Sequence, residues 1–215
     1  MNAFGRGAIT ILSLGLLILS PLSLVSAASD KVEVVNLRGP LVNAWFTSFD
    51  ASGCVETDTF VTAQLDTYQH LPGRGTTTGT GAVSIFVYDA CTDTSLLQAV
   101  GQTDTLGPAE LQISNQLDTA AMHTTITATD IETGATFDVD VDVAWTSTSD
   151  ITRDHANTND RYPGGCHVLN RWKGSGRDAI ASGVVSDGVT NFTPGPSNSG
   201  EIGLVIDGFE VIGCP

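Results

Sequence analysis

Three aspartates alternate with valines in the segment TFDVDVDVAW, which runs from Thr136 to Trp145. Residues two apart in an extended strand lie on the same face, so the carboxylates of Asp138, Asp140 and Asp142 form one acidic row. These aspartates are candidate calcium ligands. Calcium takes about six to eight oxygen ligands, more than two neighbouring strands supply without a loop. The preferred interpretation is therefore a solvent-facing row without a metal.

The partners of this row follow from a predicted hairpin turn at Thr133 and Gly134. In that register each aspartate lies opposite a threonine, in the pairs Asp138 with Thr129, Asp140 with Thr127, and Asp142 with Thr125. The other face is mostly apolar and pairs Val139 with Ala128, Val141 with Ile126, Val143 with Thr124, and Trp145 with Met122. A slip of one residue would bury carboxylates without partners, which is energetically costly.

Histidine offers the next possible chemistry. The four histidines are scattered along the chain, at His70, His123, His155 and His167. His155 lies between aspartates in a polar segment and is the best candidate for an acid, a base or a ligand. The chain has no GxSxG or HExxH motif, and its cysteines are expected to form disulfides. The sequence therefore assigns no catalytic residue, and no cofactor is expected.

Aromatic side chains are candidates for stacking against sugar rings. The tryptophans and tyrosines in question are Trp45, Trp145, Trp172, Tyr68, Tyr88 and Tyr162. Trp145 continues the valine stripe and is expected in the core, whereas Trp172 lies in the basic segment NRWKGSGRD and is expected at the surface. Trp172, Arg171 and His155 are accordingly the candidate binding residues.

A basic island interrupts the acidic chain between Ser149 and Asp178. Its basic residues are Arg153, Arg161, Arg171, Lys173 and Arg177. Such an island either neutralises carboxylates elsewhere in the fold or binds an anion, such as the acid group of a glycan. The sequence leaves both interpretations open.

These residues must be positioned by strands, because segments rich in Val, Ile, Phe and Thr alternate with turn sequences such as DASG, ETG and SDG. We predict strands near residues 41–49, 54–65, 82–90, 95–101, 110–117, 121–131, 135–146, 167–172, 179–186 and 201–212. The segment HLPGRGTTTGTG lacks the Walker and GxGxxG patterns and is expected to be a hairpin connection. Short connections favour an all-β antiparallel meander that forms a β-sandwich or a closed barrel.

The first 27 residues are expected to be a secretory signal peptide. Arg6 precedes an apolar run from Ala8 to Leu19, and the small residues Val25 and Ala27 mark a cleavage site. This pattern predicts a secreted or extracytoplasmic location. Residues 28–215 are expected to form a single β domain, released without a membrane anchor.

The four cysteines of an exported chain predict two disulfides. Sequential pairing is preferred and joins Cys54 to Cys91 and Cys166 to Cys214. The first pair follows if the strands beginning at Cys54 and ending near Cys91 form a hairpin whose turn lies near Pro72. No two cysteines have the CxxC spacing of redox and zinc sites.

Charge restricts the class of partner. The chain has a formal net charge of −15 at pH 7, which disfavours nucleic acid and anionic membrane surfaces. A glycan or another cell-surface component is compatible with this charge.

Three segments carry a resemblance to other proteins: AWFTSFDASGC, YDACTDT, and RDAIASGVVSDGVTNFTP between Arg177 and Pro194. They are similar to segments of a group of uncharacterised secreted bacterial proteins, and the similarity spans most of the chain after the signal peptide. The resemblance implies export and a β-rich fold. It implies no activity and no site residues, and in a bacterial protein the sequon at Asn191 is interpreted as a chance occurrence.

The function most compatible with these features is that of an exported, non-catalytic β module that binds a surface glycan or envelope component. One alternative is an extracellular hydrolase whose site is assembled from loops. Another is a barrel that carries a small apolar ligand, which requires an apolar cavity. An exposed aromatic cluster would favour the first class, and acidic side chains meeting in a cleft would favour the second.

Overall fold

The computed structural model describes the backbone of residues 31–65, 79–161, 167–195 and 198–214. The residues from Lys31 to Pro215 form one compact unit. The predicted signal peptide lies outside the described residues, as do His70, Tyr68, Tyr162 and Cys166. In the part of the chain that is described, no helix has the length and apolar character needed to cross a membrane.

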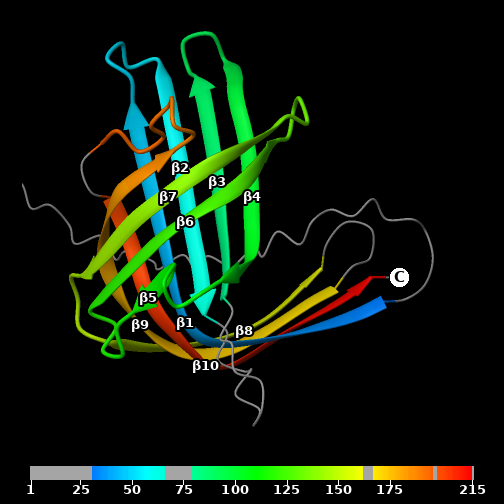
Figure 1. The fold of residues 1–215 in the computed structure, drawn as a ribbon. Helices are drawn as coiled ribbons and strands as arrows, with labels where there is room; N and C mark the ends of the chain where they lie inside the picture. Colours follow the sequence, from blue (N-terminus) through cyan, green and yellow to red (C-terminus); the bar gives the residue numbers. More distant parts are fainter. Residues whose placement is uncertain (1–30, 66–78, 162–166, 196–197, 215) are drawn as a thin grey trace, which may run out of the picture. The chain divides into compact units, whose positions relative to one another are not determined.

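All regular structure in the described residues is β (Figure 1). The strands are β1 (Lys31–Phe49), β2 (Val55–Leu65), β3 (Gly79–Asp89), β4 (Thr94–Leu106), β5 (Leu111–Ile113), β6 (Thr119–Asp130), β7 (Thr136–Ser147), β8 (Thr152–Arg161), β9 (His167–Ser186) and β10 (Asn198–Cys214). Their pairings are antiparallel, so the predicted all-β antiparallel fold is confirmed.

The sheet closes on itself as a ring. Hydrogen-bonded neighbours follow the order β10, β1, β2, β3, β4, β6, β7 and β9, and β9 pairs back with β10. The short strand β5 adds to β6, and β8 adds to β9. Because the sheet is a ring, its strands have one face toward a shared interior and one toward solvent.

Alternating side chains fill this interior. β6 and β7 alternate buried and exposed positions along most of their length. Trp145, Ile85, Leu106 and Met122 are among the largest fully buried side chains, so Trp145 lies in the core as predicted. Gly81 makes room for two of them, since a Cβ there would lie 2.8 Å from Leu106 and 2.9 Å from Met122.

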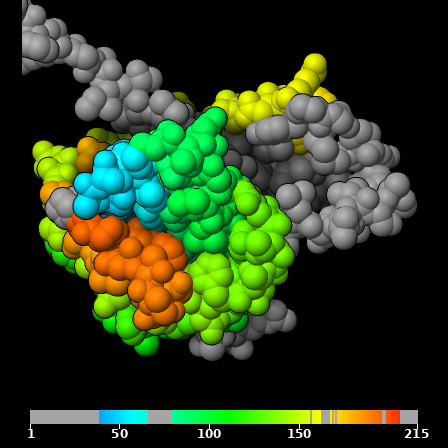
Figure 2. Space-filling model, turned by 90° about the horizontal axis from the view of Figure 1, so that it is seen from above, coloured from blue at the N-terminus to red at the C-terminus, as the bar shows by residue number. Residues whose placement is uncertain are grey.

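The segment that follows β9 closes one end of the ring. Phe192 joins the buried core, and the hydroxyl of Thr59 donates a 2.9 Å hydrogen bond to its carbonyl oxygen. The hydroxyl of Thr193 accepts from the amide of Val185 and donates to the carbonyl of Gly183, each at 3.0 Å. Figure 2 looks onto this end and shows the segment (orange) against the β1–β2 turn (cyan). The segment therefore packs as part of the core.

The β6–β7 hairpin has the predicted faces but not the predicted register. The observed pairs are shifted by two residues and join Asp138 to Thr127, Asp140 to Thr125, Asp142 to His123, Val139 to Ile126, Val141 to Thr124, Val143 to Met122, and Trp145 to Ala120. The turn is longer than predicted and is closed by two backbone hydrogen bonds. The amide of Gly134 donates to the carbonyl of Asp130, and the amide of Asp130 donates to the carbonyl of Ala135. The carboxylate of Asp130 also accepts from Glu132 and Thr133, which stabilises the longer turn.

β1, β9 and β10 are longer than the ring and continue beyond it beside β8 (Figure 1). We call this extension the arm; it comprises residues 31–37, 152–161, 167–173 and 207–214. The register shifts between Leu37 and Gly39 in β1 and between Val205 and Asp207 in β10, where the arm leaves the ring. Gly39 has a φ of 122°, a conformation that favours glycine. These bulges change the direction of the sheet.

Two expectations about this region are wrong. β8 lies in a segment that was expected to be irregular, and β9 continues through residues 173–178, where a break was expected. β8 gives no alternating signal because it covers no core, and its described side chains are exposed. In β9, Gly174 suits close strand packing, since a Cβ there would lie 2.6 Å from the carbonyl oxygen of Leu204.

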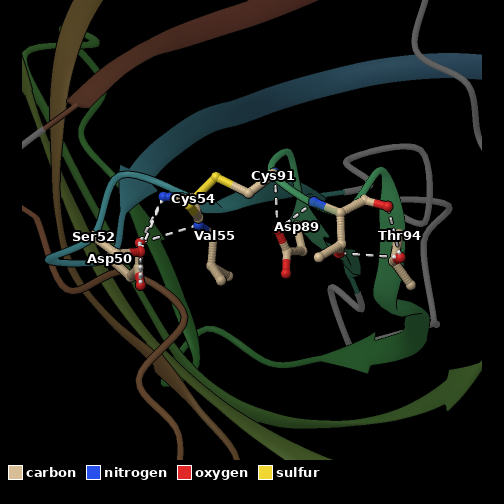
Figure 3. Close-up of a disulfide and its surroundings, with 8 residues drawn as sticks. Asp50, Ser52, Cys54, Val55, Asp89, Cys91 and Thr94 are labelled. Atoms are coloured by element: carbon tan, nitrogen blue, oxygen red, sulfur yellow. Dashed lines mark hydrogen bonds between the residues drawn. A yellow bond between two sulfur atoms is a disulfide. The ribbon is translucent and has the colours of Figure 1, made fainter.

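A disulfide joins Cys54 to Cys91, as predicted, with Cα atoms 5.2 Å apart (Figure 3). Cys54 precedes β2 and Cys91 follows β3, and the β2–β3 register places Val55 opposite Asp89. The bond therefore fastens the end of the hairpin that is remote from its connection.

Aspartates shape the turns on both sides of the disulfide (Figure 3). Asp50 Oδ1 accepts hydrogen bonds from the amides of Val55 and Cys54, both at 3.0 Å. Asp89 Oδ1 accepts from the amides of Thr92 at 3.0 Å and Cys91 at 2.9 Å. The bonds from Val55 and Thr92 are the main causes that lower the pKa values of Asp50 and Asp89. Both carboxylates thus stabilise these turns in their ionised form.

We predict that peptide mapping under non-reducing conditions recovers Cys54 joined to Cys91 and Cys166 joined to Cys214. The second pair is expected because Cys166 and Cys214 are the two cysteines that remain once Cys54 and Cys91 are joined. Serine at Cys54 and Cys91 should lower stability by about 4 kcal/mol in the chain-entropy model. Recovery of Cys54 joined to Cys166 or Cys214 would contradict this scheme.

Candidate functional site

Aromatic side chains gather on the outer side of β1, β2 and β3. Trp45, Phe86 and Tyr88 are exposed over 45%, 42% and 38% of their surfaces. Phe60, on the middle strand β2, is partly buried. We call these four residues the aromatic face.

The rings are held by cross-strand contacts. Trp45 lies opposite Phe60, with ring centroids 5.9 Å apart and planes inclined by 62°. This edge-to-face geometry is favourable and restricts both rings. Phe86 lies opposite Asp58. Asp58 comes two residues before Phe60 and is on the same side of β2. The four aromatic side chains therefore lie on one side of three neighbouring strands.

Oriented polar groups lie among these rings. Asp58 Oδ1 accepts hydrogen bonds from the hydroxyl of Thr47 at 2.5 Å and from Trp45 Nε1 at 3.4 Å. Asn43 Oδ1 accepts from the hydroxyl of Thr62 at 2.8 Å. A carboxylate has about four acceptor sites, so Asp58 retains capacity for the hydroxyls of a ligand.

Glu201 borders this region on β10, opposite Asn43 in β1 and Asp178 in β9. Its side chain is exposed, but Oε1 lies close to Gly176. A Cβ added to this glycine would be 2.8 Å from Glu201 Oε1. Desolvation is the main cause that raises the pKa of Glu201, followed by the charges of Asp178 and Asp154. A hydrogen bond from Asn43 acts in the opposite direction. Ionisation of Glu201 is therefore less favourable than that of a free glutamate.

The residues predicted to bind a ligand lie in the arm. His155 lies opposite Lys173, and Arg171, two residues before Lys173, is on the same face of β9. His155 and Arg171 are both exposed. Trp172 lies on the opposite face and is half-buried. Its ring lies close to Gly174, since a Cβ added to this glycine would be 3.3 Å from the ring. The structure thus brings Arg171 and His155 together and separates Trp172 from them.

The acidic row lies on the outer side of β7, as predicted. Asp140 accepts a 2.7 Å hydrogen bond from the hydroxyl of Thr125, and Asp138 accepts one of 2.8 Å from Thr127. Asp142 lies 3.9 Å from Nδ1 of His123, and both side chains are exposed. Within the described residues, no three His, Cys, Asp or Glu side chains are grouped so as to hold a metal ion.

Sequence reasoning missed Phe60, Phe86, Asp58, Asn43 and Glu201 as candidate site residues. A signal for part of this set is present in the segment LVNAWFTSF. Its buried residues are Val42, Ala44 and Phe46, so alternation alone places Asn43 and Trp45 together on the outer face. The contribution of β2, β3 and β10 depends on strand order and register, which the sequence does not provide.

Comparison with models of protein families, with curated proteins and with solved structures found no match to this chain.

We predict that replacing Asp138, Asp140 and Asp142 together with asparagine changes thermal stability little. Asparagine retains an acceptor oxygen for Thr125 and Thr127, and exposed charges are screened at physiological salt. Millimolar calcium should not raise the melting temperature of either protein. A rise of several degrees confined to the wild type would instead identify bound calcium.

Replacing Glu201 with glutamine should raise the melting temperature at pH 7 slightly, because solvent screens part of the effect of the charge. The pKa of Glu201 is raised in the fold, so the protonated form is favoured and stability is lost as the carboxyl ionises with rising pH. The difference from the wild type should therefore disappear below the ordinary glutamate pKa of 4.5. Glu132→Gln, in an exposed turn, is the control for loss of one charge. A Glu201→Gln variant that is less stable than the wild type at pH 7 would contradict this account.

Proposed function

We propose that this protein is an exported, non-catalytic β module that binds a neutral carbohydrate polymer on its aromatic face. The observation that supports the proposal is the exposure of Trp45, Phe86 and Tyr88 on one sheet surface around the acceptor Asp58. Aromatic rings provide apolar stacking surfaces, and oriented polar groups between them provide specificity for hydroxyls.

The charge of this surface supports a neutral ligand. Asp58 and Glu56 lie on the aromatic face, and Glu201 lies at its border. Sugar hydroxyls can donate hydrogen bonds to these carboxylates, whereas an anionic polymer would be repelled by them. A second copy of this chain, with its net charge of −15, is disfavoured for the same reason.

Export is part of the proposal. The Cys54–Cys91 disulfide is compatible with an extracytoplasmic location, since such bonds persist in oxidising compartments. The apolar segment from Ala8 to Leu19 supports secretion through a signal peptide.

A hydrolase is the second candidate function, and one specific observation favours it. Glu201 and Asp178 lie opposite each other, and the pKa of Glu201 is raised, mainly by desolvation. Two neighbouring carboxyl groups, one of them with a raised pKa, are the kind of pair that glycoside hydrolysis uses. This pair lies on the outer side of the sheet beside the aromatic face, so a hydrolase would act on the same polymer class.

The third candidate, a carrier of a small apolar ligand, has less support. The ring interior contains packed side chains such as Trp145 and Ile85. An open depression of about 330 Å³ lies instead beside β5 and β6, lined by Gln112, Ile113, Ser114, Thr119, Ala120 and Ala121. This lining is partly polar and open to solvent, unlike an enclosed apolar cavity.

We predict that the purified protein binds at least one of cellulose, chitin, xylan, starch and dextran, and that Trp45→Ala and Phe86→Ala each weaken this binding. The expected loss is about tenfold per variant, which corresponds to roughly 1.4 kcal/mol. Ile131→Ala is the matched control, because Ile131 is an exposed apolar residue, at 57%, in the β6–β7 turn.

Two outcomes decide between the proposals. Failure to bind any of these polymers, or equal binding by wild type and Trp45→Ala, would reject the aromatic face as the site. Release of reducing ends that is lost in Glu201→Gln, with binding retained, would establish the hydrolase instead.

A further inference from the structure

Charge is segregated between the two faces of the β8–β9 hairpin in the arm. One face carries the pairs Arg153 with Ser175, His155 with Lys173, Asn157 with Arg171, Asn159 with Leu169, and Arg161 with His167. The other face carries Thr152 with Gly176, Asp154 with Gly174, Ala156 with Trp172, Thr158 with Asn170, and Asp160 with Val168. The arginines, lysine and histidines of the hairpin thus lie on one face, and its aspartates lie on the other. We call the first the basic face.

The side chains of the basic face are available to solvent. The arginines, the lysine and the histidines on it are all exposed: Arg153, His155, Arg161, His167, Arg171 and Lys173. Within the described residues, no ion pair engages any of these six. One acidic residue, Asp207, lies opposite Lys173 in β10.

This face differs in position from the aromatic face. Arg177, which precedes Asp178 in β9, lies opposite the core residue Ile202, and Ser175 lies opposite Leu204. Ser175 belongs to the basic face, so the basic face continues the inner side of the ring. The aromatic face lies on the outer side. The two surfaces are therefore separate and can be tested separately.

The geometry fits a linear anion. Residues two apart along a strand are roughly 7 Å apart, and the span from Arg153 to Arg161 is roughly 26 Å. The amides of Asn157 and Asn159 lie between the charged positions and suit hydroxyl groups. Leu169 is the one apolar residue among the β8 and β9 positions of this face.

We propose that the basic face of the arm binds an acidic polysaccharide, a linear polymer with carboxylate or sulfate groups. The guanidinium and ammonium groups pair with the acid groups, and the asparagine amides contact hydroxyls between them. The rest of the acidic chain repels such a polymer and confines it to this face. The interaction is independent of neutral carbohydrate binding on the aromatic face.

The first experiment measures binding of the Trp45→Ala variant, in which the proposed site for neutral polymers is weakened, to polygalacturonate and dextran sulfate at low salt, with neutral dextran as the reference. Binding to at least one acidic polymer is expected, and its affinity should fall at least about tenfold between 50 and 200 mM salt, because bound counterions are released. Absence of binding to both acidic polymers at 50 mM salt would overturn the proposal.

The second experiment compares variants that change the net charge equally on the two faces of the hairpin. Arg171→Gln should weaken binding several-fold, and the triple variant Arg153→Gln, Arg171→Gln, Lys173→Gln should weaken it about tenfold or more. Thr158→Glu makes the same change in net charge as Arg171→Gln but on the opposite face, and it should bind within about twofold of the wild type. Equal losses in Arg171→Gln and Thr158→Glu would overturn the assignment to the basic face.

Two controls keep the test specific. Trp45→Ala should leave binding of the acidic polymers unchanged, which separates this proposal from the one for the aromatic face. Vesicles containing about one third anionic phospholipid test the membrane alternative. Vesicle binding that exceeds binding to both polymers and is lost in the triple variant would replace the polysaccharide by a lipid surface. If the triple variant does not fold, as shown by its far-ultraviolet circular dichroism, the Arg171→Gln and Thr158→Glu pair decides the outcome.

Discussion

Closure of the sheet through the pairing of β1, β10 and β9 is the constraint on which the rest of the structure depends. A closed ring has an inside and an outside, so each strand must send apolar and polar residues to opposite sides. The interior is narrow enough for glycines such as Gly81 and Gly101 to be needed beside large side chains. Large aromatic side chains that gather on the outer side lie outside this core.

The aromatic face is such a case. Trp45 occupies an outward position in β1 between Asn43 and Thr47, although its neighbours Ala44 and Phe46 are buried in the core. Trp45 is ordered by its edge-to-face contact with Phe60 and by its hydrogen bond to Asp58, so its side chain has little conformational freedom left to lose. Such preorganisation reduces the entropic cost of binding. The rigid sheet thus provides a surface of fixed shape rather than an adaptable loop.

The same closure also produces the arm. The strands that complete the ring are longer than the ring requires, and bulges near Gly39 and Val205 redirect them. β8 covers no core in the arm. Its alternating residues therefore place basic side chains on one face and acidic side chains on the other, rather than apolar and polar ones. A surface of one sign on one face and the other sign on the opposite face results. In a chain with a net charge of −15, this local basic face is a strong electrostatic contrast.

The sequence by itself determined the strand periodicity, the faces of the β6–β7 hairpin, the burial of Trp145 and the Cys54–Cys91 pairing, because these depend on local alternation and on one hairpin. The two-residue error in register arose because the carboxylate of Asp130 stabilises a longer turn, and a shift of two preserves every face. Only the tertiary structure decided that Phe86 and Glu201 lie near Trp45, since strand order brings together residues far apart in the chain. It also decided that Arg171 and His155 share a face without Trp172, because the arm pairs β8 with β9 in one register and leaves both faces without a core to cover.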